Sequence, residues 1–147
     1  MQNNIRYWIG VASRDHVMKS VDGEFAQLCH GKKAPLKKMK KGDWVIYYSP
    51  KIWSKQSAPH QKFTALGRVV DDYIFQFDME DGFIPFRRNI EFMNCTEISI
   101  HPLIPQLSFI KNKRYWGYSF RLGHLEISEN DFKIIRNEMI SYRICTK

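Results

Sequence analysis

Long hydrophobic runs are missing from this sequence of 147 residues, since none reaches the roughly 18 apolar residues that a membrane span needs. The N-terminal segment, MQNNIRYWIG, also lacks the apolar stretch that follows the basic start of a secretory signal. Cysteine is scarce: Cys29, Cys95 and Cys145 are odd in number and widely spaced, which is a poor framework for disulfides. We therefore expect a cytoplasmic protein with free thiols and no membrane partner.

The sequence motifs of the common enzyme classes are absent as well. We find no GxGxxG, no phosphate-binding GxxxxGK[ST], no GxSxG, no HExxH and no paired CxxC. The adjacent pair Cys29-His30 supplies too few ligands for a zinc site. Paired carboxylates at Asp71-Asp72 and Glu80-Asp81 lie in turn-like contexts, where solvated turn residues explain them. We therefore expect no catalytic residue, no metal and no cofactor.

What the sequence does have is an uneven surplus of positive charge, with a net charge of +8 and an isoelectric point near 9.5. Between Glu24 and Asp71 the only acid is Asp43. The same stretch carries the bases Lys32, Lys33, Lys37, Lys38, Lys40, Lys41, Lys51, Lys55, Lys62 and Arg68. A second acid-free stretch covers residues 98–125. Such segregation predicts a basic face that attracts phosphates, and the alternative is a solvated lysine surface.

Aromatic residues are abundant, with four Trp, seven Tyr and ten Phe. Several lie inside or beside the basic stretches, for example Trp44, Trp53 and Tyr118. Basic residues interleaved with aromatics suit contact with unstacked bases, because an aromatic face replaces the lost base stacking. For any single one of these residues, a place in the core is the alternative.

The hydrophobic pattern favours many short strands and few helices. Strands are expected at 6–12, 44–49, 63–71, 73–77, 83–92, 97–100 and 115–121. A short helix follows Ser13 and is broken by Gly23, a helical turn is expected near 36–39, and Pro50 is expected to end its strand. The last helix begins at the cap Ser128 and buries Phe132, Ile135 and Met139. This pattern predicts one α+β domain over residues 1–147, a small and partly closed barrel packed by helices.

Five segments in order resemble the EVE domain family. They are YWIGVASRDHV at 7–17, GEFAQLCHGKKAPLKKMKKGDWVIYYSPK at 23–51, FTALGRVVDD at 63–72, IPFRRNIEF at 84–92 and RYWGYSFRLGHLEI at 114–127. The resemblance implies a PUA-like fold, a small mixed β-barrel flanked by helices, with a C-terminal amphipathic helix. It also implies similarity to YTH domains, which bind methylated adenine in RNA within an aromatic cage, and to ASCH domains, some of which resemble nucleases.

By this resemblance the chain is expected to read a modified base in DNA or RNA, with a separate protein of a restriction or defence system as its effector. Two alternatives stay open. One is a nuclease or other hydrolase of the ASCH kind, and the other is a general RNA-binding module without preference for modification.

The expected base pocket comprises Ser13, Phe25, Gln27, Tyr47, Tyr48, Ser49, Phe77 and Met79. Ser13 ends the first strand, although it is equally well explained as a helix cap. Phe25 corresponds by resemblance to a cage-bearing segment of the YTH fold, and Gln27 can form two hydrogen bonds to a base. Tyr47, Tyr48 and Ser49 end a strand of which one face must be core. Phe77 and Met79 are candidates for the second wall.

The expected phosphate-binding face comprises His30, Lys32, Lys33, Lys37, Lys38, Lys40, Lys41, Arg87 and Arg88. The lysines would supply nonspecific attraction to the nucleic-acid backbone. Arg87 and Arg88 are neighbours in an expected strand, so their side chains should point to opposite faces. One of them is then free for phosphate while the other pairs with an acid.

Overall fold

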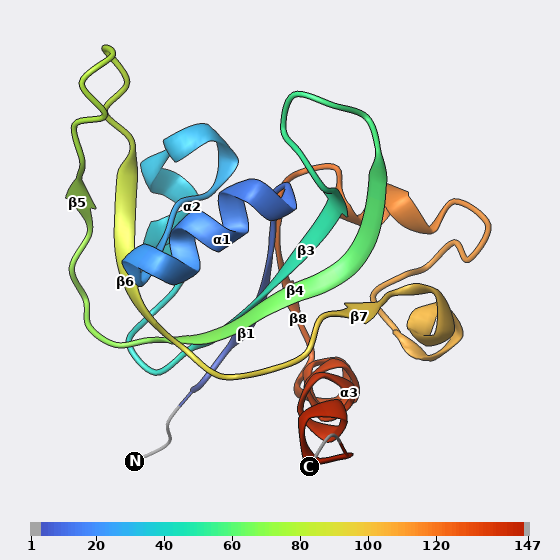
Figure 1. The fold of residues 1–147 in the computed structure, drawn as a ribbon. Helices are drawn as coiled ribbons and strands as arrows, with labels where there is room; N and C mark the ends of the chain where they lie inside the picture. Colours follow the sequence, from blue (N-terminus) through green and yellow to red (C-terminus); the bar gives the residue numbers. More distant parts are fainter. Residues whose placement is uncertain (1–3, 146–147) are drawn as a thin grey trace.

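A curled mixed sheet is the centre of the structure, a computed structural model that describes residues 4–145 (Figure 1). Its strands are β1 (Tyr7–Val11), β2 (Phe25–Ala26), β3 (Trp44–Lys51), β4 (Pro59–Val69), β5 (Phe75–Gln76), β6 (Phe86–Phe92), β7 (Ile98–Ser99) and β8 (His124–Ile127). The main strand order is β2-β6-β4-β3-β1-β8, while β5 pairs with β6 and β7 pairs with β4. Only β1 and β3 pair in parallel. The sheet therefore forms a half-barrel, as the sequence predicts.

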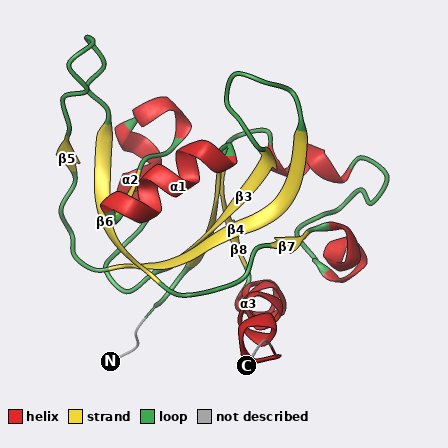
Figure 2. Ribbon diagram, in the orientation of Figure 1, coloured by secondary structure: helices red, strands yellow, loops and turns green. Residues whose placement is uncertain are grey.

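Helices cover both faces of this sheet (Figure 2). They are α1 (Arg14–Gly23), α2 (Lys33–Lys38) and α3 (Glu129–Cys145), with the 3-10 helices η1 (Cys29–Gly31), η2 (His101–Gln106) and η3 (Trp116–Phe120). The helices α1 and α2 lie inside the curl, and α3 lies against the other face. Among the described residues no helix has both the length and the apolar character needed to cross a membrane.

The two faces of the sheet follow from strict alternation along the central strands. In β3, Ile46 and Tyr48 belong to the core beneath α3, whereas Val45 and Tyr47 belong to the core beneath α1 and α2. In β1 the same alternation puts Ile9 in the first core and Trp8 in the second. Because side chains in a strand alternate in direction, a central strand covered on both sides buries all of them. Both strands therefore contribute side chains to each of the two cores.

The predicted cap and buried stripe of the last helix are also confirmed. The Asp131 backbone N–H donates to Ser128 Oγ at 3.1 Å, and Phe132, Ile135 and Met139 are buried. The Asp131 carboxylate does not return to Ser128. It accepts hydrogen bonds from the Ser108 N–H, the Ser108 hydroxyl and the Phe109 N–H, and it thereby joins α3 to the segment that follows η2.

Two predictions about strands are wrong. Residues 115–121 form η3 and not a strand, because Trp116 and Phe120 turn inward while Tyr118 stays exposed, and the last strand is β8. Pro50 does not end its strand, which continues to Lys51. A register shift between β3 and β4 lies at Ser49 to Lys51, and an irregular pairing of this kind tolerates proline.

Candidate functional site

A cavity of about 740 Å³ opens where α1, β2, η1 and the connection from η3 to β8 meet. Its volume lies within the range of about 300–1,000 Å³ typical of small-molecule and cofactor pockets. The lining residues are Val11, Ala12, Ser13, His16, Lys19, Ser20, Phe25, Gln27, Cys29, His30, Lys32, Lys51, Ser54, Met79, Phe83, Arg87, Arg121, Leu122 and Gly123. They come from six separate segments, so the cavity exists only in the folded chain.

The cavity is basic. Its lining includes five permanent cations, Lys19, Lys32, Lys51, Arg87 and Arg121, and no Asp or Glu is among the described residues that line it. The nearest carboxylate in sequence, Asp15, is engaged, since it accepts hydrogen bonds from the Ser13 hydroxyl and from the backbone N–H and hydroxyl of Ser54. Five cations without a carboxylate among them favour an anionic ligand.

Arg87 is the best-connected polar side chain of the cavity. Its guanidinium carbon lies 3.8 Å from the ring centroid of Phe25 and 4.1 Å from that of Phe77, so the planar group is stacked between two aromatic rings. Arg87 Nε donates to Gln27 Oε1 at 2.9 Å, and Arg87 Nη2 lies 3.2 Å from Met79 Sδ. Burial lowers the pKa of this guanidinium from its usual value. Phe25, Gln27, Met79 and Arg87 thus form one fixed cluster.

The edge formed by η1 is held in an unusual backbone conformation. Cys29, His30 and Gly31 have φ angles of 49°, 62° and 81°, in the left-handed region that disfavours all residues but glycine. The turn is held because Gly31 N and Lys32 N both donate to Leu28 O, at 2.9 and 3.2 Å. Cys29 Sγ lies 3.5 Å from Leu122 O, and burial raises the pKa of this free thiol. Strain of this kind collects at binding sites, where the surrounding structure maintains it.

Seven of the residues expected at the site line this cavity together. Ser13, Phe25, Gln27 and Met79 come from the expected base pocket, and His30, Lys32 and Arg87 from the expected phosphate-binding face. Ser13 precedes α1 without a side-chain bond to the helix backbone. Its hydroxyl instead donates to Asp15, so the cap interpretation is only partly correct.

Tyr47, Tyr48 and Ser49 do not line the cavity. They are buried in the centre of the sheet, where both faces of β3 are covered. Tyr48 stacks on Phe120 with ring centroids 4.3 Å apart, and the Ser49 hydroxyl bonds to the Thr64 hydroxyl at 2.8 Å. Tyr47 lies behind the cavity, since its hydroxyl accepts a hydrogen bond from Gln27 N at 3.4 Å. Burial raises the pKa of Tyr47 to about 12.

Arg88 is a structural residue and not a contact for phosphate. It is buried and donates to the backbone carbonyls of Leu36, Met39 and Asp71, with Asp72 3.4 Å away. The expectation that one of the two arginines pairs with an acid is therefore correct for Arg88. Arg88 joins α2 to the residues that follow β4 and so fixes α2 in place. Of these two neighbouring arginines, Arg87 is the one that lines the cavity.

The other expected residues lie outside the cavity lining. Phe77 is half exposed and stacks on Arg87 from the side opposite Phe25. Lys33, Lys37, Lys38, Lys40 and Lys41 belong to α2 and the turn after it. Lys33 lies over the Phe86 ring at 5.6 Å. These five lysines lie outside the lining and add to the positive field around the protein.

Sequence reasoning missed twelve of the 19 lining residues, including His16, Lys19, Lys51, Phe83, Arg121 and Leu122. The sequence contains a signal for His16, because Ser13, His16 and Ser20 have the spacing of one helix face. Arg121 was hidden by the wrong assignment of residues 115–121 to a strand. The carboxylates of Asp71 and Asp81 accept hydrogen bonds from Tyr73 N and Phe83 N, which confirms that they are turn residues.

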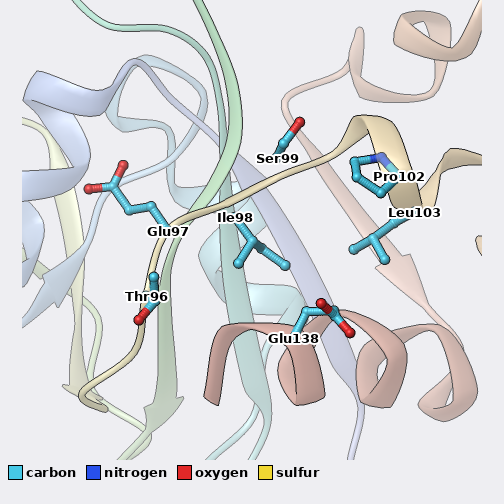
Figure 3. A pocket seen from close by; sticks show the side chains of 7 residues that line it. All are labelled: Thr96, Glu97, Ile98, Ser99, Pro102, Leu103 and Glu138. Carbon is cyan, nitrogen blue, oxygen red and sulfur yellow. The ribbon is translucent and has the colours of Figure 1, made fainter. Parts of the chain in front are cut away.

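A smaller cavity of about 250 Å³ lies between β7, η2 and α3 (Figure 3). Its lining includes Glu97 and Glu138, and no Lys, Arg or His is among the described residues that form it. The Glu97 carboxylate accepts hydrogen bonds from Arg14 and pairs with His60 Nε2 at 2.7 Å, and these partners keep its pKa low despite burial. Carboxylates repel anions, so the larger, basic cavity is the better candidate for an anionic ligand. In the described part of the chain no three His, Cys, Asp or Glu side chains could hold a metal ion.

Comparison with known proteins agrees with the sequence resemblance. The family model described as the EVE domain matches residues 6–138. A protein of Bacillus licheniformis, named "UPF0310 protein in gntR 5'region", is 62% identical over 128 residues, covering 87% of each chain.

Solved YTH domains share the fold at low sequence identity. The YTH domain of the Zygosaccharomyces rouxii MRB1 protein, in complex with N6-methyladenosine RNA, has a TM-score of 0.59 at 11% identity and covers 93% of this chain and 88% of its own. The Pho92 YTH domain in complex with m6A has a TM-score of 0.60 at 15% identity, covering 95% and 85%. The fold is therefore PUA- and YTH-like.

Proposed function

Because this chain belongs to the EVE domain family, with a fold shared by YTH domains, we propose that it is a nucleic-acid-binding module that reads a modified base in its basic cavity. The observation that carries the proposal is the composition of the cavity lining, five cations and no carboxylate beside the cluster of Phe25, Gln27 and Arg87. The cations suit the phosphates on both sides of the base, and the cluster suits the base itself.

The base would lie on the Phe83 ring, which lines the cavity, and against the edge of the Arg87 guanidinium. Phe25 and Phe77 cover both faces of that guanidinium, so Arg87 can offer a base the N–H donors of its edge but no stacking surface. Since Gln27 Oε1 accepts from Arg87, its amide orientation is fixed and its NH₂ group is left to donate to a base edge. Phe83 and Met79 line the same cavity and supply apolar surface for an added alkyl group.

The sizes of the free-energy contributions indicate which contacts must discriminate between a modified and a plain base. Flipping a base out of a duplex costs a few kcal/mol, and each stacking contact returns about 1–3 kcal/mol. Burying one methyl group contributes only about 0.8 kcal/mol, which corresponds to roughly a fourfold preference. Sharp selection for a modification therefore depends on the fixed orientation of Gln27 and Arg87 as well as on the extra apolar contact.

The test is a binding panel measured by fluorescence polarisation. The probes are DNA and RNA oligonucleotides of one sequence whose central base is plain, methylated or hydroxymethylated. We expect at least a severalfold preference for one modification. Phe25→Ala should abolish that preference and leave the salt-sensitive background binding. Tyr73→Ala, at an exposed tyrosine outside the cavity, is the matched control and should bind like the wild type. Equal affinity across the whole panel would contradict the proposal.

We further propose that the chain binds without cleaving, and that any reaction on the nucleic acid belongs to a separate effector protein. The absence of carboxylates from the described cavity lining supports this, since they are the usual bases and metal ligands of nucleases. Incubation of the purified chain with labelled DNA and RNA, with and without divalent cations, should yield no products. Cleavage that Arg87→Ala removes would favour the nuclease alternative.

A further inference from the structure

The 3-10 helix η3 and its cap residue Tyr115 lead into the cavity and present their aromatic residues in two opposite directions. Phe120 stacks on the buried ring of Tyr48 at 4.3 Å, and Trp116 meets the same ring edge-on at 6.4 Å. Both residues anchor η3 in the core. Tyr115 and Tyr118 remain 62% and 65% exposed, although tyrosine rings of this size normally gain by burial. The core packing of η3 does not explain these two exposed rings.

The three-residue spacing of Tyr115, Tyr118 and Arg121 explains why their side chains share one face of η3. A 3-10 helix has three residues per turn, so the side chains of residues 115, 118 and 121 lie almost above one another, about 6 Å apart along the axis. Arg121 lies with its guanidinium carbon 3.8 Å from the Tyr118 ring centroid, and Arg114 lies 5.4 Å from that of Tyr115. We call the surface made by Arg114, Tyr115, Tyr118 and Arg121 the tyrosine face.

The backbone beneath the tyrosine face is fixed. Asn112 Oδ1 accepts hydrogen bonds from the N–H groups of Arg114 and Tyr115, both at 3.1 Å. The Tyr118 N–H donates to Tyr115 O at 3.0 Å, and the Ser119 hydroxyl donates to Phe109 O at 3.3 Å. A ring held on a fixed backbone has little freedom left to lose when a ligand stacks on it.

The tyrosine face is continuous with the cavity and has the same charge. Arg121 belongs to both, and the next two residues, Leu122 and Gly123, line the cavity. Residues 98–125 contain no acid, and Lys111 and Lys113 precede the face in the sequence. We infer that the tyrosine face binds unpaired bases of a single-stranded DNA or RNA that flank the base held in the cavity, an inference that rests on the proposed function.

Nucleic acid fits this surface better than a protein does. A single strand offers flat, unstacked rings and one negative charge per nucleotide, and Tyr–Arg pairs supply a stacking surface and a cation together. Stacking on aromatic residues tolerates any base, so the tyrosine face would add affinity and not sequence choice. An acidic protein is the other occupant with matching charge, and the test separates the two.

The test uses plain oligonucleotides of about 12 nucleotides, a length within known single-strand site sizes, as single-stranded DNA, single-stranded RNA and duplex. We expect Tyr115→Ala with Tyr118→Ala to weaken single-strand binding about tenfold or more, and to change duplex binding far less, because duplex bases are already stacked. Replacing both residues with Phe should preserve binding, since the rings remain. Tyr73→Ala is the matched exposed control. An unchanged unfolding temperature verifies that the variants fold.

The outcomes distinguish this inference from the proposed function. A double alanine variant that keeps wild-type affinity for single strands overturns the tyrosine face, even if the modified-base panel still shows a preference. An equal loss for single strands and duplex also overturns it. If the panel shows no preference but the variant weakens single-strand binding, the modified-base proposal fails and the tyrosine face stands. Failure to bind any oligonucleotide overturns both, and leaves the acidic protein as the partner to test.

Discussion

At the scale of single residues, Arg87 contributes shape as well as charge. Its planar group is stacked between Phe25 and Phe77, and a lysine ammonium at the same position could attract phosphate but could not stack. Arg87→Lys should therefore lower the affinity for the preferred modified oligonucleotide by about tenfold, a cation–π and stacking loss of about 1–2 kcal/mol. The measurement is the ratio of the dissociation constants for modified and plain probes.

The matched control for this substitution is Arg68→Lys. Arg68 also lies over an aromatic ring, 5.4 Å from the centroid of Trp44, but outside the cavity lining. Arg68→Lys should leave the ratio of the dissociation constants for modified and plain probes unchanged. If Arg87→Lys binds the modified probe as tightly as the wild type, the stacked guanidinium is not part of the base site.

His124 gives the stability of the protein a dependence on pH. Its ring stacks on Trp8 with centroids 4.7 Å apart, and its Nε2 is buried with no hydrogen-bond partner among the described residues. Burial, with a smaller effect from Lys38, lowers its pKa to about 4. The unfolded chain, where a histidine has a pKa of about 6.5, therefore takes up a proton before the folded chain does. Stability contributed by neutral His124 is complete above about pH 6.5 and is lost as the pH falls towards 4.

Urea unfolding between pH 7.5 and pH 4.5 measures this effect. The free energy of unfolding of the wild type should fall by on the order of 2 kcal/mol over that interval. His124→Phe keeps a ring against Trp8 and removes the titrating group, so its curve should be flatter. Parallel curves for the two proteins would show that other groups cause the acid sensitivity.

At the scale of elements, η1 depends on one glycine. Gly31 has a φ of 81°, and a Cβ built on it would lie 2.4 Å from Pro85 Cβ. Gly31→Ala therefore combines a left-handed alanine with a clash against the residue that precedes β6. We expect it to lower the free energy of unfolding by about 3 kcal/mol and to weaken probe binding, because η1 forms one edge of the cavity.

Substitutions at two other glycines separate the backbone cost from the steric cost in the stability that Gly31→Ala is expected to lose. Gly42 has a φ of 93° with nothing near its Cβ position, so Gly42→Ala measures the backbone cost alone, about 1 kcal/mol. Gly117 has open space and no positive φ, so Gly117→Ala should be nearly neutral. Denaturant midpoints that rank Gly31→Ala no worse than Gly42→Ala would mean that Pro85 yields to the added methyl group.

The elements also show how far sequence reasoning reaches. Alternation in β1 and β3 and the cap of α3 are local signals, and each correctly predicted its element. Four of the seven residues 115–121 are aromatic, and which of them face inward is decided by packing on Tyr48, a residue far away in the chain. Tyr47 to Ser49 were misplaced for the same reason, since only the tertiary fold shows that β3 is covered on both faces.

At the scale of the whole molecule, the charges are separated in space. The cavity lining carries the five cations, and Asp78, Glu80 and Asp81 gather at the tip of the β5–β6 hairpin, which projects from the body of the protein and borders the cavity only through Met79 and Phe83 (Figure 1). Other acids, Glu129 and Glu138 among them, belong to α3 on the opposite face of the sheet. Under the proposed function, a phosphate chain would be attracted to the cavity and the tyrosine face, whereas α3, with three acids and three bases in its sequence, would neither attract nor repel it.

This separation predicts a specific response to salt. Each cation that neutralises a phosphate of a single strand adds about 0.7 to the slope of log affinity against log salt concentration. Lys19→Ala and Lys32→Ala, at two lining residues, should each reduce that slope by about this amount and weaken plain and modified probes alike. Lys133→Ala is the control, because Lys133 lies on α3 and already pairs with Glu129 at 3.1 Å. Titrations from about 50 to 200 mM salt measure the slopes. If Lys133→Ala reduced the slope as much as Lys19→Ala or Lys32→Ala, the phosphates would be responding to net charge alone, and the cavity would not be where the strand lies.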